Sequence, residues 1–145
     1  MIKFNSKIVT VLVNALLALW ILPQWITGFI GWLIFRNGKL YYNEDSKILV
    51  INVNKGHLFG GACFSSGPII FTTPECSENT IKHETGHSVQ SLMFGWLFHI
   101  IVSLPSIALF WYKRLTNKDQ KFYHSHWPEN YADKCGNVDI SEYGS

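Results

Sequence analysis

Apolar residues are concentrated in two long segments of the chain. The first, 8–35, contains no charged residue. It exceeds the roughly 20 apolar residues that cross a bilayer as one helix. Lys3 and Lys7 precede it, as in a signal peptide, but it is too long for one and no cleavage site of small residues follows. We therefore predict one N-terminal transmembrane helix within an anchor formed by residues 1–36.

The second apolar segment, 92–112, is also long enough to span a bilayer. Its titratable side chains are His99 and Tyr112. Length alone therefore predicts a second transmembrane helix, and the position of other residues described below argues against it.

Short runs of β-branched and aromatic residues lie between the two apolar segments. The runs 39–42, 47–53, 57–64 and 68–73 are separated by turn residues, which predicts a small antiparallel sheet. A helix follows that begins near Pro74 or Ser77. The chain therefore reads as an α+β protein whose second domain covers residues 37–145.

The helix that precedes the second apolar segment is amphipathic. Ile81 and Val89 fall on one face, and His83 and His87 on the opposite face. Gly86 costs about 1 kcal/mol in a helix interior, so we expect another segment to pack closely against this turn. In the polar tail, Pro and Gly bound a predicted short helix at 128–134.

Charge and cysteine content narrow the function classes. The net charge is +2 with neutral histidines, and the 12 Lys and Arg residues are scattered, which does not indicate a nucleic-acid-binding surface. Cys63, Cys76 and Cys135 are widely spaced without a CxxC pair. We interpret them as free thiols in a reducing compartment, in preference to metal ligands.

Residues 83–87 read HETGH, a match to HExxH. Histidines four residues apart lie one above the other on a helix, so His83 and His87 can both bind one Zn²⁺ at about 2.0–2.1 Å. Glu84 can reach a water on the ion without binding the ion itself. Zinc lowers the pKa of such a water towards about 7, and Glu84 then acts as general base. The alternative is two solvated histidines on a helix face.

A hydrolytic zinc site needs a third protein ligand and one open position. Glu129 and Asp133 lie four residues apart on the predicted C-terminal helix and therefore share a face. We expect Glu129 to bind the metal and Asp133 to accept a hydrogen bond from a ligand histidine, most simply His83.

The third ligand decides how we interpret the second apolar segment. If 92–112 crossed the bilayer, Glu129 would lie on the other side of it from His83 and His87. Pro105, within 102–107, can break the helix. We therefore predict a helical hairpin that dips into one leaflet and returns to its starting side, holding the zinc site at the membrane surface.

HExxH followed by ExxxD resembles the gluzincin type of zinc metallopeptidase. The sequence ENYAD at 129–133 is similar to the EYxAD element of membrane-integrated zinc endopeptidases such as the CAAX prenyl proteases. The segments LPQ, SSGP, HETGHSVQS and SLPS also resemble small bacterial membrane proteins. The resemblance implies a zincin-like domain in which His83, His87 and Glu129 bind the zinc ion. It also implies Glu84 as the base and Asp133 as the hydrogen-bond acceptor for a ligand histidine. It covers only these motifs and implies no substrate class.

An oxyanion donor would assist this chemistry, and the chain offers His124, His126, Tyr123 and Tyr131 without singling one out. We predict a membrane-anchored zinc peptidase acting on a peptide or protein substrate. The segment 57–64 is a candidate edge strand for that substrate. The alternative is a structural zinc site, in a partner of a membrane complex, with His124, His126 or Cys135 as fourth ligand.

Basic residues near the predicted membrane ends favour a bacterial cytoplasmic membrane with the catalytic part on the cytoplasmic side. The predicted partners are a lipid bilayer and the substrate, without nucleic acid. The sequence does not indicate an oligomeric state.

Overall fold

The computed structural model describes residues 6–44, 48–53 and 63–141. In chain order its elements are α1 (Lys7–Trp20), α2 (Leu22–Ile34), β1 (Lys39–Asn43), β2 (Ile48–Asn52), β3 (Phe64–Ser66), β4 (Ile69–Thr72), α3 (Glu78–Phe94), η1 (Gly95–Leu97), η2 (His99–Ser103), α4 (Leu104–Leu115), α5 (Gln120–His124) and α6 (Glu129–Gly136). The predicted α+β class is confirmed.

The first apolar segment is not one helix. It divides at Ile21 into α1 and α2, whose axes are bent by 71°. Pro23 lies in the first turn of α2, where a missing N–H is tolerated, so the chain starts a new helix there. Among the described residues, no single helix is long and apolar enough to cross a membrane, although this bent pair and the pair 78–97 with 99–115 pass together on length and composition. The prediction of a single transmembrane helix is therefore wrong.

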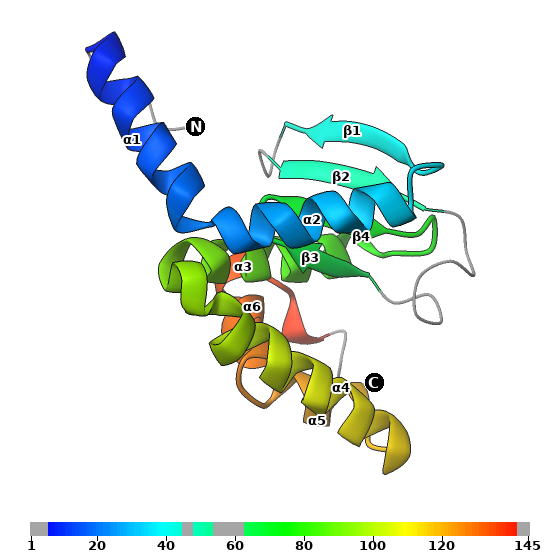
Figure 1. Ribbon diagram of the computed structural model, residues 1–145. Coiled ribbons are helices and arrows are strands. Elements are labelled where there is room, and N and C mark those ends of the chain that lie inside the picture. The colour runs from blue at the N-terminus through cyan, green and yellow to red at the C-terminus, as the bar shows by residue number, and fades with distance from the viewer. Residues whose placement is uncertain (1–5, 45–47, 54–62, 142–145) are drawn as a thin grey trace.

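The two N-terminal helices differ in what they contact. Helix α1 has no buried residue and projects away from the rest of the protein (Figure 1). Helix α2 packs on the sheet through Gly28, where a Cβ atom would meet Ile69, and through Gly31, where it would meet Phe71. These glycines let the helix approach the strands closely.

The sheet has the order β1-β2-β4-β3. β1 pairs antiparallel with β2, and β3 pairs antiparallel with β4. β2 and β4 run parallel, so the prediction of an antiparallel sheet is wrong for the central pair. β3 lies at the far edge of the sheet, one position beyond β4. A tight turn at Gly67 (φ 58°) then brings the chain back as β4 between β3 and β2, and there β4 runs parallel to β2. The predicted strand residues 57–62 lie outside the described residues. The core of the sheet consists of Ile51, Val53, Ile69 and Phe71.

Helix α3 buries its polar face. Asn79, His83, Glu84, His87 and Gln90 are buried, whereas the apolar side chains of Val89, Leu92 and Trp96 farther along the chain are exposed. The amphipathic pattern of this helix was predicted, and the structure directs its polar side towards the protein interior.

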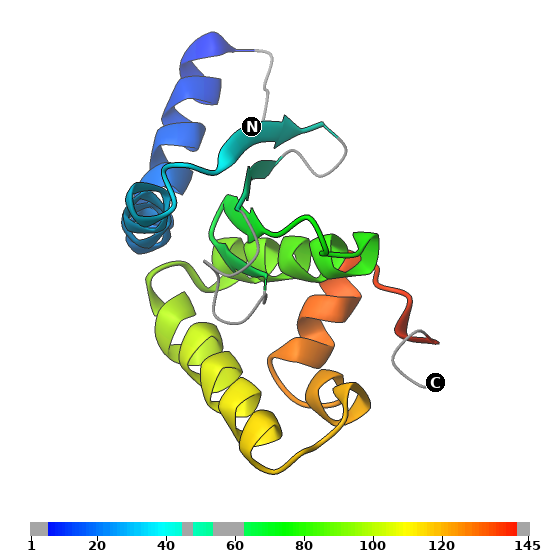
Figure 2. The same ribbon diagram turned by 90° about the vertical axis from the view of Figure 1, so that its right-hand side faces the viewer.

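The second apolar segment bends at a different place from the one predicted. Gly95, with φ 51°, ends α3, and the helical stretches Glu78–Leu97 and His99–Leu115 are bent by 119° relative to each other. Pro105 lies in the first turn of α4 and breaks nothing. The predicted membrane-dipping hairpin with its break at 102–107 is therefore wrong. Figure 2 shows α4 leaving the end of α3, and α5 and α6 bringing the chain back to α3.

A disulfide joins Cys63, just before β3, to Cys76, just before α3. The prediction of free thiols is wrong for these two residues. Cys135, on α6, is a free cysteine.

Candidate metal centre

Helix α3 supplies two of the converging side chains. Ser77 caps the helix by accepting a hydrogen bond from the Thr80 amide. Two turns on, His83 and His87 lie on the buried face with their ring centres 4.8 Å apart. The four-residue spacing predicted from the sequence therefore places both imidazoles on one side of α3.

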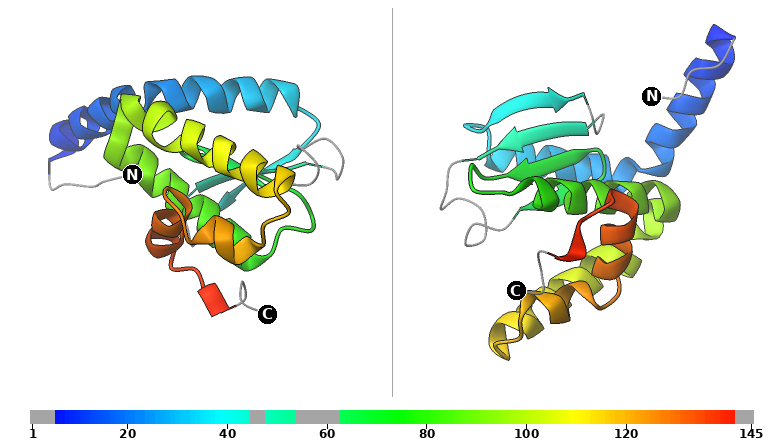
Figure 3. Two further views of the ribbon diagram at one scale, coloured as in Figure 1. Left: turned by 90° about the horizontal axis from the view of Figure 1, so that it is seen from below. Right: turned by 180° about the vertical axis from the view of Figure 1, so that it is seen from behind.

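Helix α6 supplies the carboxylates, because it packs almost backbone to backbone against α3. A Cβ atom at Gly86 would collide with the carbonyl of Ala132, and one at Gly136 would collide with that of Lys82. The expectation of close packing at Gly86 is confirmed. Views from two further directions show α6 beside α3 (Figure 3). Glu129 and Asp133 consequently face the histidines.

Three atoms meet at one point between the helices. Oε2 of Glu129 lies 2.9 Å from Nε2 of His83 and 3.2 Å from Nε2 of His87. These three atoms lie within 4.8 Å of one another. Ligands held at about 2.0–2.1 Å in a tetrahedral site are about 3.3 Å apart. The observed spacing is close to that value, so little movement is needed to admit an ion.

The buried carboxylate of Glu129 also has one oxygen whose hydrogen-bonding capacity is unsatisfied. Its side chain is fully buried, and Oε1 has no hydrogen-bond partner. A buried acceptor without a partner is costly, and a bound cation satisfies it. These buried His and Glu groups could hold a metal ion.

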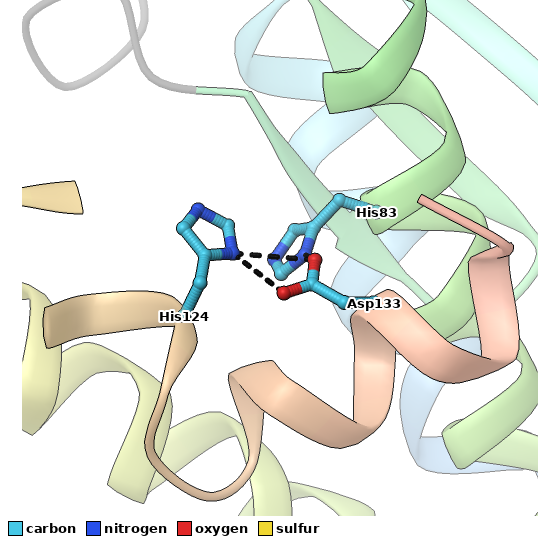
Figure 4. Close-up of side chains that lie close together, drawn as sticks. All are labelled: His83, His124 and Asp133. Carbon is cyan, nitrogen blue, oxygen red and sulfur yellow. Dashed lines mark hydrogen bonds and ion pairs between the residues drawn. The ribbon is translucent and has the colours of Figure 1, made fainter. Parts of the chain in front are cut away.

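Asp133 fixes the orientation of His83 from behind. Its Oδ1 accepts a hydrogen bond from His83 Nδ1 at 2.7 Å, which leaves Nε2 for a metal ion. His124 Nδ1 donates to Oδ2 of the same carboxylate at 2.9 Å. Figure 4 shows the Asp133 carboxylate between the two imidazole rings.

Gln90 fixes the orientation of the His87 ring, as Asp133 fixes that of the His83 ring. Its Oε1 accepts from His87 Nδ1 at 2.7 Å, and its Nε2 donates to the Pro128 carbonyl at 2.9 Å. Sequence reasoning missed this residue. The available signal was an amide three residues after a ligand histidine, on the same helix face.

His83, His124 and Asp133 form a second group that could hold a cation. A neutral imidazole has one lone pair, so His83 can offer either Nε2 or Nδ1 to an ion but not both. Both oxygens of Asp133 already accept hydrogen bonds, whereas Oε1 of Glu129 accepts none. We therefore assign the metal position to His83, His87 and Glu129, and the hydrogen-bonded support to Asp133 and His124.

Without an ion, the buried histidines and Glu129 stabilise one another's charges. Burial lowers the pKa of His83, but hydrogen bonds to Asp133 and Glu129 raise it to about 10. The pKa of His87 is also raised, because the bond to Glu129 outweighs the effect of burial. Burial raises the pKa of Glu129, but hydrogen bonds from both histidines hold it well below its usual range. The site is thus an ionised carboxylate that accepts hydrogen bonds from two protonated imidazoles, and a cation could take the place of their Nε2 protons.

A cavity of about 420 Å³ opens beside the three converging atoms. Glu84, His87 and Tyr123 are among the residues that line it. Burial, reinforced by the charge of Glu129, raises the pKa of Tyr123. Its hydroxyl therefore stays protonated and is a hydrogen-bond donor.

The structure does not bring the other candidate oxyanion donors to this cavity. The His126 ring lies 2.7 Å from the Phe122 carbonyl, the Tyr131 hydroxyl contacts Met93, and His124 is engaged with Asp133. Cys135 belongs to neither group of potential metal ligands in the described part of the chain, and His57 lies outside that part.

Comparisons with models of protein families, with curated proteins and with solved structures found no match.

Proposed function

We propose that this protein is a zinc-dependent peptidase. The observation that carries the proposal is the convergence of His83 Nε2, His87 Nε2 and Glu129 Oε2 beside a cavity that His87 and Glu84 line. Three protein ligands with room for water are typical of catalytic rather than structural zinc sites.

Zinc suits the donor atoms better than other common ions. Two imidazole nitrogens and one carboxylate oxygen form a known catalytic zinc set. Magnesium and calcium prefer oxygen ligands. Glu129 Oε1, which has no hydrogen-bond partner, could also bind the zinc ion.

A bound zinc ion would act as a Lewis acid that makes a water molecule acidic. In our proposal Glu84 takes the proton from that water and then delivers it to the leaving amine. Tyr123 donates its O–H to the oxygen that becomes negative during attack on the carbonyl. Asp133 and Gln90 hold the His83 and His87 rings in the tautomers that present Nε2.

We propose that a peptide substrate binds along β3. β3 is an edge strand of the sheet, and Phe64, Ser65 and Ser66 line the cavity. An edge strand offers unpaired backbone groups that an extended peptide can pair with. In this proposal the substrate adds as a further strand, with its scissile bond near Glu84.

A structural zinc site in a partner of a membrane complex is the competing function. It requires a fourth protein ligand. Among residues 6–44, 48–53 and 63–141, the His83, His87 and Glu129 group includes no fourth His, Cys, Asp or Glu. The adjoining cavity favours the hydrolytic alternative.

We further propose that the protein acts at the surface of a lipid bilayer in the bacterial cell membrane. Supporting this, α1 exposes Ile8, Leu12 and Leu16 by 72%, 58% and 65%. Exposed apolar surface of this extent is typical of lipid or protein contact. Flotation of purified protein with liposomes tests it; failure to float would count against it.

Metal analysis and a peptidase assay test the proposed activity. We expect one zinc ion per chain and hydrolysis of a quenched fluorescent peptide. The Glu84→Gln variant should keep the zinc and lose hydrolysis, and a His83→Ala/His87→Ala variant should lose both. Zinc retained in the double variant, or hydrolysis retained in Glu84→Gln, would refute the proposal.

A further inference from the structure

The cavity beside Glu84 has mostly apolar walls from elements distant in sequence. Its apolar side chains are Phe64 of β3, Phe98 between η1 and η2, Val102 of η2, and Ile107, Phe110 and Trp111 of α4. At about 420 Å³ it falls within the 300–1,000 Å³ range of small-molecule sites.

Three hydroxyl groups in the wall, those of Thr27, Ser66 and Ser103, are already hydrogen-bonded to protein. Thr27 Oγ1 and Ser66 Oγ are 2.6 Å apart, and Ser66 Oγ also donates to the Gln24 carbonyl at 3.0 Å. His99 Nδ1 and Ser103 Oγ are 3.1 Å apart. This polar strip therefore offers few free partners to a ligand.

The charges of the lining residues also favour an apolar ligand over a charged one. Among the described residues that line the cavity, Glu84 is the single one of the Asp, Glu, Lys and Arg types. In the proposed reaction Glu84 acts as the base. A charged group placed against Phe98 and Phe110 would lose its hydration without gaining a counter-ion. An apolar group in the same place gains by leaving water.

We propose that this cavity binds a large apolar side chain of the peptide substrate, aromatic or long aliphatic, beside the bond that is cleaved. This inference rests on the proposed peptidase function. Because Glu84, His87 and Tyr123 form part of the same wall, a side chain in the cavity belongs to a residue next to the reacting carbonyl. One methylene in such a pocket changes kcat/KM by about 10- to 200-fold. We expect Phe or Leu to be preferred over Ala by at least about tenfold.

Ile107 and Leu104 provide a matched pair of variants. Both lie on α4, with exposed fractions of 54% and 61%, so a lysine at either costs the fold little. Ile107 lines the cavity and Leu104 does not. Ile107→Lys places a cation at the cavity wall, whereas Leu104→Lys adds the same charge elsewhere on the helix.

Binding is measured first, so that the result does not depend on hydrolysis. Zinc-loaded Glu84→Gln protein is titrated with a fluorescent Ala/Gly peptide carrying one central Phe, and with its Ala and Glu counterparts. The Phe peptide should bind at least about tenfold tighter than the Ala peptide. Adding Ile107→Lys should abolish that preference and favour the Glu peptide, whereas adding Leu104→Lys should leave it unchanged.

The outcomes separate the two proposals. Equal binding of the Phe and Ala peptides, or an unchanged preference in Ile107→Lys, overturns the inference even if the wild-type protein cleaves peptides. A Phe preference that Ile107→Lys removes supports apolar side-chain binding in the cavity even if no peptide is cleaved, and then the peptidase proposal and the position beside a cleaved bond fail. Binding of lauric acid in preference to every peptide would replace the peptide side chain with a lipid chain and overturn the inference.

Discussion

Gly86 of α3 lies directly against the backbone of Ala132 of α6, with no room between them for a Cβ atom. A second such contact joins Gly136 to the Lys82 carbonyl. The two contacts bracket Asp133 and bring Glu129 to the histidines. The candidate metal position therefore depends on glycine at residues that bear no functional group.

Replacing Gly86 with alanine is expected to destabilise the protein and weaken zinc binding. Alanine in a helix interior is normally favourable by about 1 kcal/mol relative to glycine. Here the new methyl group meets backbone atoms that cannot rotate away, so we expect a net loss of about 1–3 kcal/mol. Thermal unfolding and zinc content measure the two effects. Thr85→Ala, on the same turn, is the control; a more stable Gly86→Ala protein that keeps its zinc would contradict the packing argument.

Zinc should stabilise the folded chain through His83 and His87. An ion that binds only the folded state, present at 100 times its Kd, adds about 2.7 kcal/mol to the free energy of unfolding. We expect the Tm to rise with zinc concentration and the rise to be absent in the His83→Ala/His87→Ala variant. An equal rise in both proteins would place the bound zinc elsewhere.

Gln90→Leu should weaken zinc binding by about 10- to 100-fold, as is usual when a partner of a ligand histidine is removed. The substitution deprives His87 Nδ1 and the Pro128 carbonyl of their partners. Ser91→Ala changes a neighbouring buried side chain, whose hydroxyl donates to the Ser88 carbonyl, and serves as control. Competition with a fluorescent zinc chelator gives both affinities; similar values would show that Gln90 does not support the site.

Loss of Asp133 should reduce zinc affinity more than loss of His124. Asp133 accepts a hydrogen bond from the proposed ligand His83, whereas His124 reaches that ring through the Asp133 carboxylate and through an edge-on ring contact, with 4.9 Å between the ring centres. We expect Asp133→Ala to be the weaker binder and His124→Phe to be intermediate. His124→Asn, which keeps a donor, should recover part of the loss. A larger effect from His124→Phe than from Asp133→Ala would favour direct metal binding by His124.

Alkylation tests the disulfide between Cys63 and Cys76. Protein unfolded in guanidinium without reductant should take up iodoacetamide at Cys135 alone, and at all three cysteines after reduction. Mass spectrometry counts the additions. The disulfide closes a loop with a sequence separation of 13, so a Cys63→Ser/Cys76→Ser variant should lose about 3 kcal/mol of stability. Three additions before reduction would refute the disulfide.

The sequence alone determined the local features of this protein. Two histidines four residues apart must share a helix face, and so must Glu129 and Asp133, because helix geometry depends only on spacing. The strand runs and the short C-terminal helix followed in the same way from patterns of a few residues. These features supplied the α+β class and every residue that now surrounds the candidate metal position except Gln90.

Only the tertiary structure decided how these pieces meet. The strand pattern carries no information on direction, so the parallel pairing of β2 with β4 was missed. The long apolar segments were read as one transmembrane helix and one hairpin with its break at 102–107, because hydropathy does not show that the bends lie at Ile21 and Phe98. The polar face of α3 is buried because α6 offers Glu129 and Asp133 as partners for it, and partners separated by some 45 residues do not appear in a helical period.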